Sequence, residues 1–384
     1  MRIFVLGLDG AVKHLIDRPE LPNLQKVIRE GCLCDLISRP PITSVAWTSM
    51  VSGVNAGKHG IFGFRIGDKL NFSTEKKAKE LWDYLPSIAI NIPMTFPVRP
   101  IDGIMISGMM TPELNENSVY PASEMEYLKQ IGFIFEPEID LKSCGQSIDI
   151  KIELTKHYLD YNWELFFVVF REFDVIQHFF WGQDLPYYQK IDHFLDWLIN
   201  EKNLFHDEQT SLLIVSDHGF APVDKTFDLQ EWVNQNGYAK QVMVGGWGAL
   251  YIKTETENEK QKIKKGLEEN LKQIKYDGKP ILDVYPREKI YWGPYAEKGP
   301  DIVVSPKRTL GFTFGMRTGK IIGASTHKNG CHLEEGVFAA WGPQIKGLRD
   351  INREARVYDV MPTVLELAGK EMPKEVDGVN LLSY

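Results

Sequence analysis

Side chains that can bind metal ions follow the ends of several apolar runs in this sequence. Carboxylates and neutral imidazoles suit Zn²⁺ and similar divalent ions. A single Asp after a strand is usually a turn residue and a single His is usually structural, so none of these residues is informative alone. Their repeated position after predicted strands indicates a metal centre at one sheet edge. The candidate ligands after such runs are Asp9, Asp174, His178, Asp217 and His218, and His332 joins them shortly before the run at 337–340.

Two adjacent hydroxyl residues, Thr43 and Ser44, follow a pair of prolines and precede a helix-compatible stretch that ends at Gly53. The free N–H groups and the dipole at a helix N-terminus favour an anion. A Ser or Thr at such a position is most often only a cap. Beside a metal cluster it becomes a candidate nucleophile, because a metal can lower the pKa of an alcohol as it lowers that of water. Position alone leaves Thr43 and Ser44 as alternatives.

The apolar runs predict buried strands, and amphipathic stretches between them predict helices. This alternation is typical of a doubly wound α/β fold with a mostly parallel sheet and helices on both faces, in which ligands bind beyond the carboxyl ends of the strands. The main predicted strands are 3–8, 165–170, 212–215, 302–304 and 337–340, and the main predicted helices are 24–29, 148–162, 187–200 and 360–368.

The pattern of predicted elements changes between residues 221 and 300, where a Gly-rich turn precedes short strand-like segments and a charged helix at 255–274. We interpret this segment as a small inserted α+β cap. The predicted catalytic core then comprises residues 1–220 and 301–384.

Composition excludes several classes of function. The chain has 384 residues, 43% of them hydrophobic, and a net charge of −8. No basic stripe is present, which disfavours a nucleic-acid polymer as partner. The apolar start is too short for a signal segment or a membrane span, and four cysteines are too few for a disulfide framework. We expect a cytoplasmic protein with no membrane partner; its oligomeric state is left open.

Six ordered motifs resemble the type I phosphodiesterase/nucleotide pyrophosphatase branch of the alkaline phosphatase superfamily. Their order and spacing fit from residue 3 to Val379, with further matches at Tyr358-Asp359 and Asp377-Gly378. The motifs are Gly-Leu-Asp9-Gly, Pro-Pro-Ile-Thr43 through Ser-Gly53, Lys-His59-Gly60-Ile, Phe-Asp174-Val-Ile-Gln-His178, Ser-Asp217-His218-Gly and Cys-His332-Leu-Glu-Glu-Gly.

The resemblance implies an alkaline phosphatase-like fold and two bound divalent ions, preferably Zn²⁺, with Mn²⁺ or another divalent ion as the alternative. It implies one ion on Asp174, His178 and His332, and a second on Asp9, Asp217, His218 and Thr43. It also implies that Thr43 forms a covalent phospho-enzyme, which would leave Ser44 as a helix cap. We interpret His59 as structural. His327 competes with His332, which has the family spacing to Gly336.

The implied activity is hydrolysis of a small-molecule phosphodiester. A monoesterase, a phosphonate hydrolase or a phosphotransferase on the same scaffold is the alternative, and a non-catalytic phosphate-binding protein is a third hypothesis. The sequence does not identify the leaving group. Aromatic residues that could stack against it are Phe62, Phe64, Trp181, Trp247 and Trp292, although packing roles are commoner for such residues. Arg39 and Arg65 flank the nucleophile segment as possible charge partners.

Overall fold

The computed structural model describes residues 1–67, 69–206, 209–315, 319–325, 328–345, 351 and 353–382. Its larger lobe is built on a nine-stranded sheet with the strand order β22-β2-β21-β9-β1-β8-β5-β6-β7. All strands run parallel except β21 and β7. In the same order, the strands are Ala355–Arg356, Cys32–Ile37, Glu335–Trp341, Thr210–Val215, Arg2–Leu8, Leu165–Phe170, Ser87–Ile92, Gly103–Ser107 and Val119–Tyr120.

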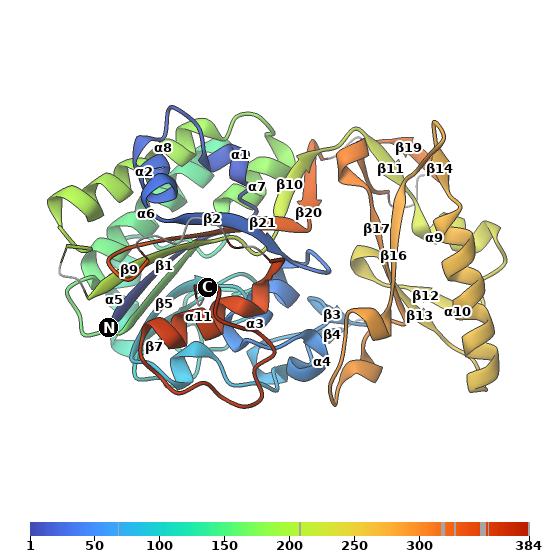
Figure 1. Cartoon of the computed structure of the whole chain (residues 1–384), viewed down its shortest axis with the longest axis horizontal. Helices are drawn as coiled ribbons and strands as arrows, with labels where there is room; N and C mark the ends of the chain where they lie inside the picture. The colour runs from blue at the N-terminus through green and yellow to red at the C-terminus, as the bar shows by residue number, and fades with distance from the viewer. Residues whose placement is uncertain are drawn as a thin grey trace.

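Helices cover both faces of this sheet (Figure 1). Residues of β1 alternate between two cores: Phe4 and Leu6 pack with one helix layer, whereas Ile3 and Val5 pack with the other. Because successive strand residues point to opposite faces, one strand serves both layers. The first layer contains α2 (Pro22–Glu30), α6 (Leu141–Tyr158) and α8 (Leu185–Asp196), and the second contains α3 (Thr43–Ser52) and α11 (Val360–Leu367). The predicted doubly wound α/β fold is therefore confirmed.

Shorter helices complete the larger lobe. They are α1 (Lys13–Ile16), α4 (Ala56–His59), α5 (Met125–Gln130) and α7 (Glu172–Phe179), which follows β8 directly. A two-stranded hairpin of β3 (Arg65–Ile66) and β4 (Lys69–Leu70) lies near the junction with the second lobe (Figure 1). Within the described ranges, every helix is too short or too polar to span a bilayer.

A smaller lobe lies to one side of the sheet, beyond the antiparallel pair β10 (Gly219–Pro222) and β20 (Gly330–Leu333) (Figure 1). Its described residues form a four-stranded sheet, a three-stranded sheet, a hairpin and two helices. The four-stranded sheet consists of β12 (Val242–Val244), β13 (Ala249–Ile252), β17 (Ile302–Pro306) and β16 (Leu282–Pro286), and the three-stranded sheet of β18 (Phe312–Phe314), β11 (Lys225–Phe227) and β19 (Ile322–Ala324). The hairpin pairs β14 (Lys275–Tyr276) with β15 (Lys279–Pro280), and the helices are α9 (Leu229–Gln235) and α10 (Glu257–Lys272).

The strand predicted at 302–304 is present, but it lies outside the central sheet. The apolar run at 302–304 forms β17, which pairs with β13 and β16 in the smaller lobe instead of joining the central sheet. An apolar run predicts burial but does not identify the partner strands. The division of the chain at residues 221 and 300 stays a prediction, although β17, β18 and β19 pair with strands of the second lobe.

Candidate active site

The central strands bring three of the predicted ligand segments to one edge of the sheet. Strands β8, β1 and β9 are parallel neighbours, so their carboxyl ends lie side by side. Asp9 follows β1, Asp217 and His218 follow β9, and Asp174 and His178 lie on α7 after β8. All five side chains are buried. This placement agrees with the binding edge expected of a doubly wound sheet.

His332 reaches the same edge from β20, which pairs with β10 so that His332 lies opposite Phe220. Its Nε2 atom lies 3.0 Å from Asp174 Oδ1 and 2.9 Å from His178 Nε2. His178 Nε2 is 3.4 Å from the same carboxylate oxygen, as expected for residues four apart on a helix. These three side chains therefore form one compact group. The alternative residue, His327, lies outside the described residues.

A second group lies beside the first. His218 Nε2 is 3.6 Å from Asp9 Oδ1 and 3.2 Å from Asp217 Oδ2. The hydroxyl oxygen of Thr43 is 3.3 Å from the same imidazole nitrogen. His218 also lies within ligand distance of the first group, and its ring stacks on that of His332 with centroids 3.6 Å apart. The structure thus brings together all seven residues that the sequence singled out.

The three histidines turn the same ring nitrogen toward the cluster. Their Nδ1 atoms lie 2.9, 2.9 and 3.2 Å from the carbonyl oxygens of Gly330, Pro41 and Gly219. A carbonyl oxygen only accepts a hydrogen bond, so Nδ1 carries the proton and Nε2 presents a lone pair. A backbone carbonyl behind the imidazole is the usual way to orient a metal-binding histidine. Two facing lone pairs, 2.9 Å apart on His178 and His332, repel unless a cation lies near both.

Two buried carboxylates would also be stabilised by a cation, because each has an oxygen without a hydrogen-bond donor in the described part of the chain. Among the described residues, Asp9 Oδ1 and Asp217 Oδ2 are buried without a hydrogen-bond donor. Burial, and then the charges of Asp217 and Asp174, raises the pKa of Asp9 well above its ordinary value. Burial, and then the charge of Asp174, raises the pKa of Asp217 to about 8. Buried anionic oxygens without partners are expensive unless they are paired or coordinate a metal.

The pKa values of Asp174, His178 and His332 shift in the opposite direction, to below their ordinary values. Burial acts to raise the pKa of Asp174, but His178, His332 and Arg171 hold that pKa well below its ordinary value. Burial lowers the pKa of His178 to about 4 and that of His332 to about 3. The imidazoles are therefore neutral near pH 7, which is the form that binds metal. This set of carboxylate oxygens and imidazole nitrogens fits divalent ions.

Helix α3 positions the hydroxyl of Thr43. The cis bond before Pro40 and the extended backbone of Ile42 (φ −119°, ψ 118°) lead into a helix whose first residue is Thr43. Ile42 occupies the cap position, so the prediction that Ser44 caps this helix is wrong. Ser44 lies inside the first turn, and its buried hydroxyl has no partner among the described residues. The prolines start the helix without a side-chain cap.

Several residues at the site were not predicted from the sequence. The indole N–H of Trp47 donates to Asp9 Oδ2 over 3.1 Å, one helical turn after Thr43. Arg171 lies 3.7 Å from Asp174 and 3.2 Å from Glu136. The spacing of Thr43 and Trp47 by four residues was the available signal for the first contact.

The aromatic candidates divide into three groups. Phe62, Phe64 and Trp247 line a cavity of about 440 Å³ that also touches Ile42, the residue before Thr43. Trp247 also stacks on His332, with ring centroids 4.3 Å apart. Trp181 lies close to Gly330 instead. Of these five candidates, only the first three therefore border the cavity that Ile42 also lines.

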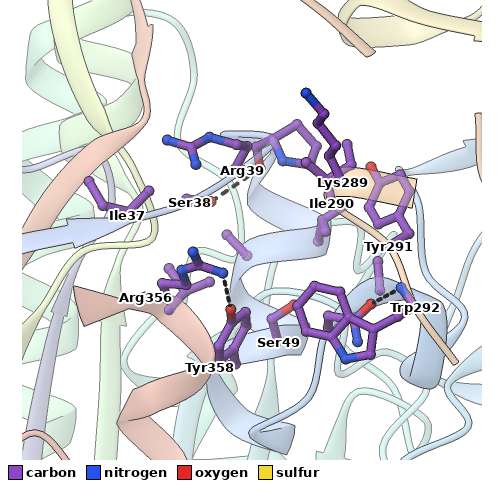
Figure 2. Close-up of a pocket in the computed structure, with 16 residues that line it drawn as sticks. Ile37, Ser38, Arg39, Ser49, Lys289, Ile290, Tyr291, Trp292, Arg356 and Tyr358 are labelled. Atoms are coloured by element: carbon purple, nitrogen blue, oxygen red, sulfur yellow. Dashed lines mark hydrogen bonds between the residues drawn. The ribbon is translucent and has the colours of Figure 1, made fainter. Parts of the chain in front are cut away.

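Trp292 lines a different cavity, of about 70 Å³, against the Ala46 and Ser49 face of α3 (Figure 2). None of the seven clustered residues lines it. Arg39 also borders this cavity and forms an ion pair with Glu334 at 2.7 Å. Arg39 is thus already neutralised by a carboxylate.

Comparison with known proteins defines the class. The structure resembles phosphonoacetate hydrolase from Sinorhizobium meliloti 1021 in complex with phosphonoformate (TM-score 0.67, 13% identity, 96% of this chain and 95% of that chain). It also resembles human ectonucleotide pyrophosphatase/phosphodiesterase 5 (TM-score 0.62, 16%, 97% and 96%) and the alkaline phosphatase PafA (TM-score 0.63, 12%, 98% and 98%). The fold is that of the alkaline phosphatase superfamily. None of the curated protein sequences matches the chain.

The chain belongs to the type I phosphodiesterase/nucleotide pyrophosphatase family, whose model matches residues 3–331. The resemblance noted from the motifs is confirmed. Members of this family are metal-dependent hydrolases of phosphoric esters, and the buried carboxylate and imidazole groups are candidate metal-binding sites. His332 lies one residue beyond the matched range, so its assignment depends on the geometry of the cluster.

Proposed function

We propose that this protein hydrolyses phosphodiesters through a covalent intermediate on Thr43, with two divalent ions, preferably Zn²⁺. The observation that carries the proposal is the convergence of a hydroxyl at a helix start with buried, donor-free carboxylate oxygens and imidazole lone pairs. One ion would be held by Asp174, His178 and His332, and the other by Asp9, Asp217, His218 and Thr43.

Thr43 supplies the attacking oxygen in this mechanism. The start of α3 directs backbone N–H groups and the positive end of the helix dipole toward an incoming anion. The Thr43 oxygen forms a bond to phosphorus while the bond to the leaving oxygen breaks. Water then cleaves the phospho-threonine, so one diester and one water give an alcohol and a phosphomonoester. The ions, when bound, would activate the oxygen nucleophiles and neutralise charge on the phosphoryl oxygens.

The cavity beside Ile42 supports an organic substituent on the substrate. Its volume of about 440 Å³ lies in the range of ordinary small-molecule sites, and its walls include aromatic side chains. Phe62, Phe64, Trp247 and Tyr251 could pack against a planar or apolar group. A diester offers such a group on each side of phosphorus.

The alternatives are a monoesterase, a phosphonate hydrolase or a phosphotransferase on the same scaffold. The resemblance to phosphonoacetate hydrolase and to PafA extends over the whole fold, so fold alone does not separate these activities. A non-catalytic binding protein would have no need for a hydroxyl beside candidate metal ligands, as at Thr43 and His218. The cytoplasmic location stays part of the proposal, supported by four unpaired cysteines.

The test uses metal-loaded protein with bis(p-nitrophenyl) phosphate and p-nitrophenyl phosphate at one pH. We expect a higher kcat/KM for the diester, two ions per chain, and loss of turnover on chelation with recovery on adding Zn²⁺. His332→Ala should lose about one ion. Turnover that survives complete metal removal would contradict the proposal, and a clear monoester preference would favour the first alternative.

A further inference from the structure

The segment around Lys328 is tied to the metal-site helix by its backbone. Asn329 N donates to His178 O over 2.8 Å, and His178 Nδ1 donates to Gly330 O over 2.9 Å. The Ser325 hydroxyl holds the carbonyl of Lys328 at 2.9 Å. These bonds fix the backbone of Lys328 beside α7, while its four-carbon side chain leaves the ammonium free to move by a few ångströms.

The ammonium of Lys328 reaches the edge of the cluster. Its Nζ atom lies 3.3 Å from His178 Nε2 and 5.6 Å from the ring centre of Trp247. Within the part of the chain that the structure describes, no carboxylate lies within ion-pair distance of this ammonium. A half-buried cation beside the cluster and without an anionic partner is suited to an anion that comes from solution.

Trp247 is held beneath this ammonium by a backbone conformation that is unusual for its residue type. It has φ 57° and ψ 35° and lies between Gly246 and Gly248. A Cβ atom on Gly248 would lie 1.9 Å from the carbonyl oxygen of Val304, so the loop packs too closely for a larger residue there. Strained residues of this kind persist mainly at functional sites.

Other basic residues near the nucleophile are less well placed. Arg39 is paired with Glu334, and Arg171 is paired with Glu136 and Asp174. Arg65 is exposed on the wall of the aromatic cavity. Lys328, in contrast, contacts an imidazole that we place in the metal site, so a phosphoryl group bound there would lie within a few ångströms of its ammonium.

We propose that Lys328, backed by Trp247, is a specificity-determining residue that binds one further negative charge on the substrate beside the attacked phosphorus. That charge can be the additional oxygen of a monoester or the second phosphoryl group of a diphosphate. A neutral substituent on phosphorus would not be bound more tightly by the ammonium of Lys328. The inference depends on the proposed phosphoryl transfer to Thr43 and names the charge class of its substrate.

The test compares three substrates with wild-type protein and with Lys328→Met, which keeps a linear side chain against Trp247 but removes the charge. The substrates are bis(p-nitrophenyl) phosphate, p-nitrophenyl phosphate and P1,P2-diphenyl diphosphate. We expect kcat/KM to fall about 10- to 100-fold for the two substrates with the extra charge, the range for a hydrogen bond to a charged group. For the simple diester the change should stay below about threefold. The two charged substrates separate the two sources of the charge.

A second readout does not require turnover. In a Thr43→Ala background, Lys328→Met should weaken calorimetric binding of inorganic phosphate about tenfold or more and leave dimethyl phosphate unchanged. Lys307→Met, a matched lysine in the second lobe that pairs with Asp283, is the control. Equal losses for all three substrates, loss of bound metal, or no change in any ratio would overturn the inference. If no substrate shows Thr43-dependent turnover in wild type, the proposed function itself fails.

Discussion

Two buried pairs of a hydroxyl and an imidazole involve helix α3, and they differ in chemistry. Thr43 Oγ1 lies 3.3 Å from His218 Nε2, and Ser49 Oγ lies 2.9 Å from His59 Nε2. All four side chains are at most 5% exposed. Judged by distance alone, Ser49 would be the better candidate nucleophile.

The proton on each imidazole reverses that judgement. The N–H of Ile61 donates to His59 Nδ1, so the proton of this neutral ring is on Nε2 and is donated to Ser49. His218 instead uses Nδ1 to donate to Gly219 O, and its Nε2 lone pair faces Thr43. A hydroxyl that accepts a hydrogen bond from histidine is not activated by it.

The surroundings reinforce the contrast. His218 lies within 4 Å of the carboxylates of Asp9 and Asp217, whereas no described carboxylate lies within ion-pair distance of His59. Ser49 lines the small cavity shown in Figure 2, which none of the seven clustered residues borders. Convergence of carboxylates and imidazole lone pairs, more than a short hydroxyl–imidazole distance, distinguishes the candidate active site. The interpretation of His59 as a structural residue agrees with these contacts.

The largest expected difference is between the two hydroxyls. Thr43→Ala should lower kcat by several powers of ten, as for loss of other covalent nucleophiles, with metal content unchanged. Ser49→Ala should change kcat by less than about threefold, because its hydroxyl does not face the cluster. Steady-state kinetics with metal analysis measures both. Comparable losses in the two variants would remove the distinction between the pairs.

Substitution of His218 should affect metal binding, whereas substitution of His59 should affect the stability of the fold. His218→Ala should weaken metal binding by more than the 10- to 100-fold typical of an outer-shell change. His59→Ala should leave metal content intact but lower the free energy of unfolding by about 2–4 kcal/mol, through lost hydrogen bonds and a cavity. Metal titration and urea unfolding provide the two measurements, and metal loss in His59→Ala would count against its structural role.

A smaller effect is expected at the outer contact on Asp9. Trp47→Phe keeps a ring in the core but removes the donor to Asp9 Oδ2, and should cost about 10- to 100-fold in metal affinity or activity. Trp82→Phe is the matched control, because it removes a similar bond of 3.0 Å to Glu80 outside the site. If both variants behave alike, the Trp47 contact has no special role at the cluster.

The smallest effect is a pH dependence of stability from His59. Burial lowers its pKa from an ordinary 6.5 to about 3. The unfolded chain therefore takes up a proton below pH 6.5 that the folded protein excludes, so stability falls as the pH falls. Between pH 6.5 and pH 5 this group should cost about 2 kcal/mol. Urea unfolding of wild type and His59→Gln should differ in pH slope by that amount, and parallel slopes would refute it.

Local sequence determined much of this protein because its signals are short-range. Apolar runs followed by Asp or His marked β1, β8 and β9 with their terminal side chains, and the order of motifs placed the chain in its family. The start of the helix after Pro40 and Pro41 was also predictable from the sequence, because proline restricts its own backbone and that of the preceding residue. In a parallel sheet, strand ends alone indicate which residues share an edge.

Tertiary structure decided everything that depends on partners distant in the chain. It assigned residues 302–306 to the second lobe, because β13 and β16 provide the hydrogen bonds that an apolar pattern cannot specify. It also set the protonation of the imidazoles through carbonyls such as Gly330 O and Pro41 O, and brought Lys328 and Trp247 to the cluster. Sequence identified side chains capable of chemistry, whereas long-range contacts determined where their lone pairs and charges meet.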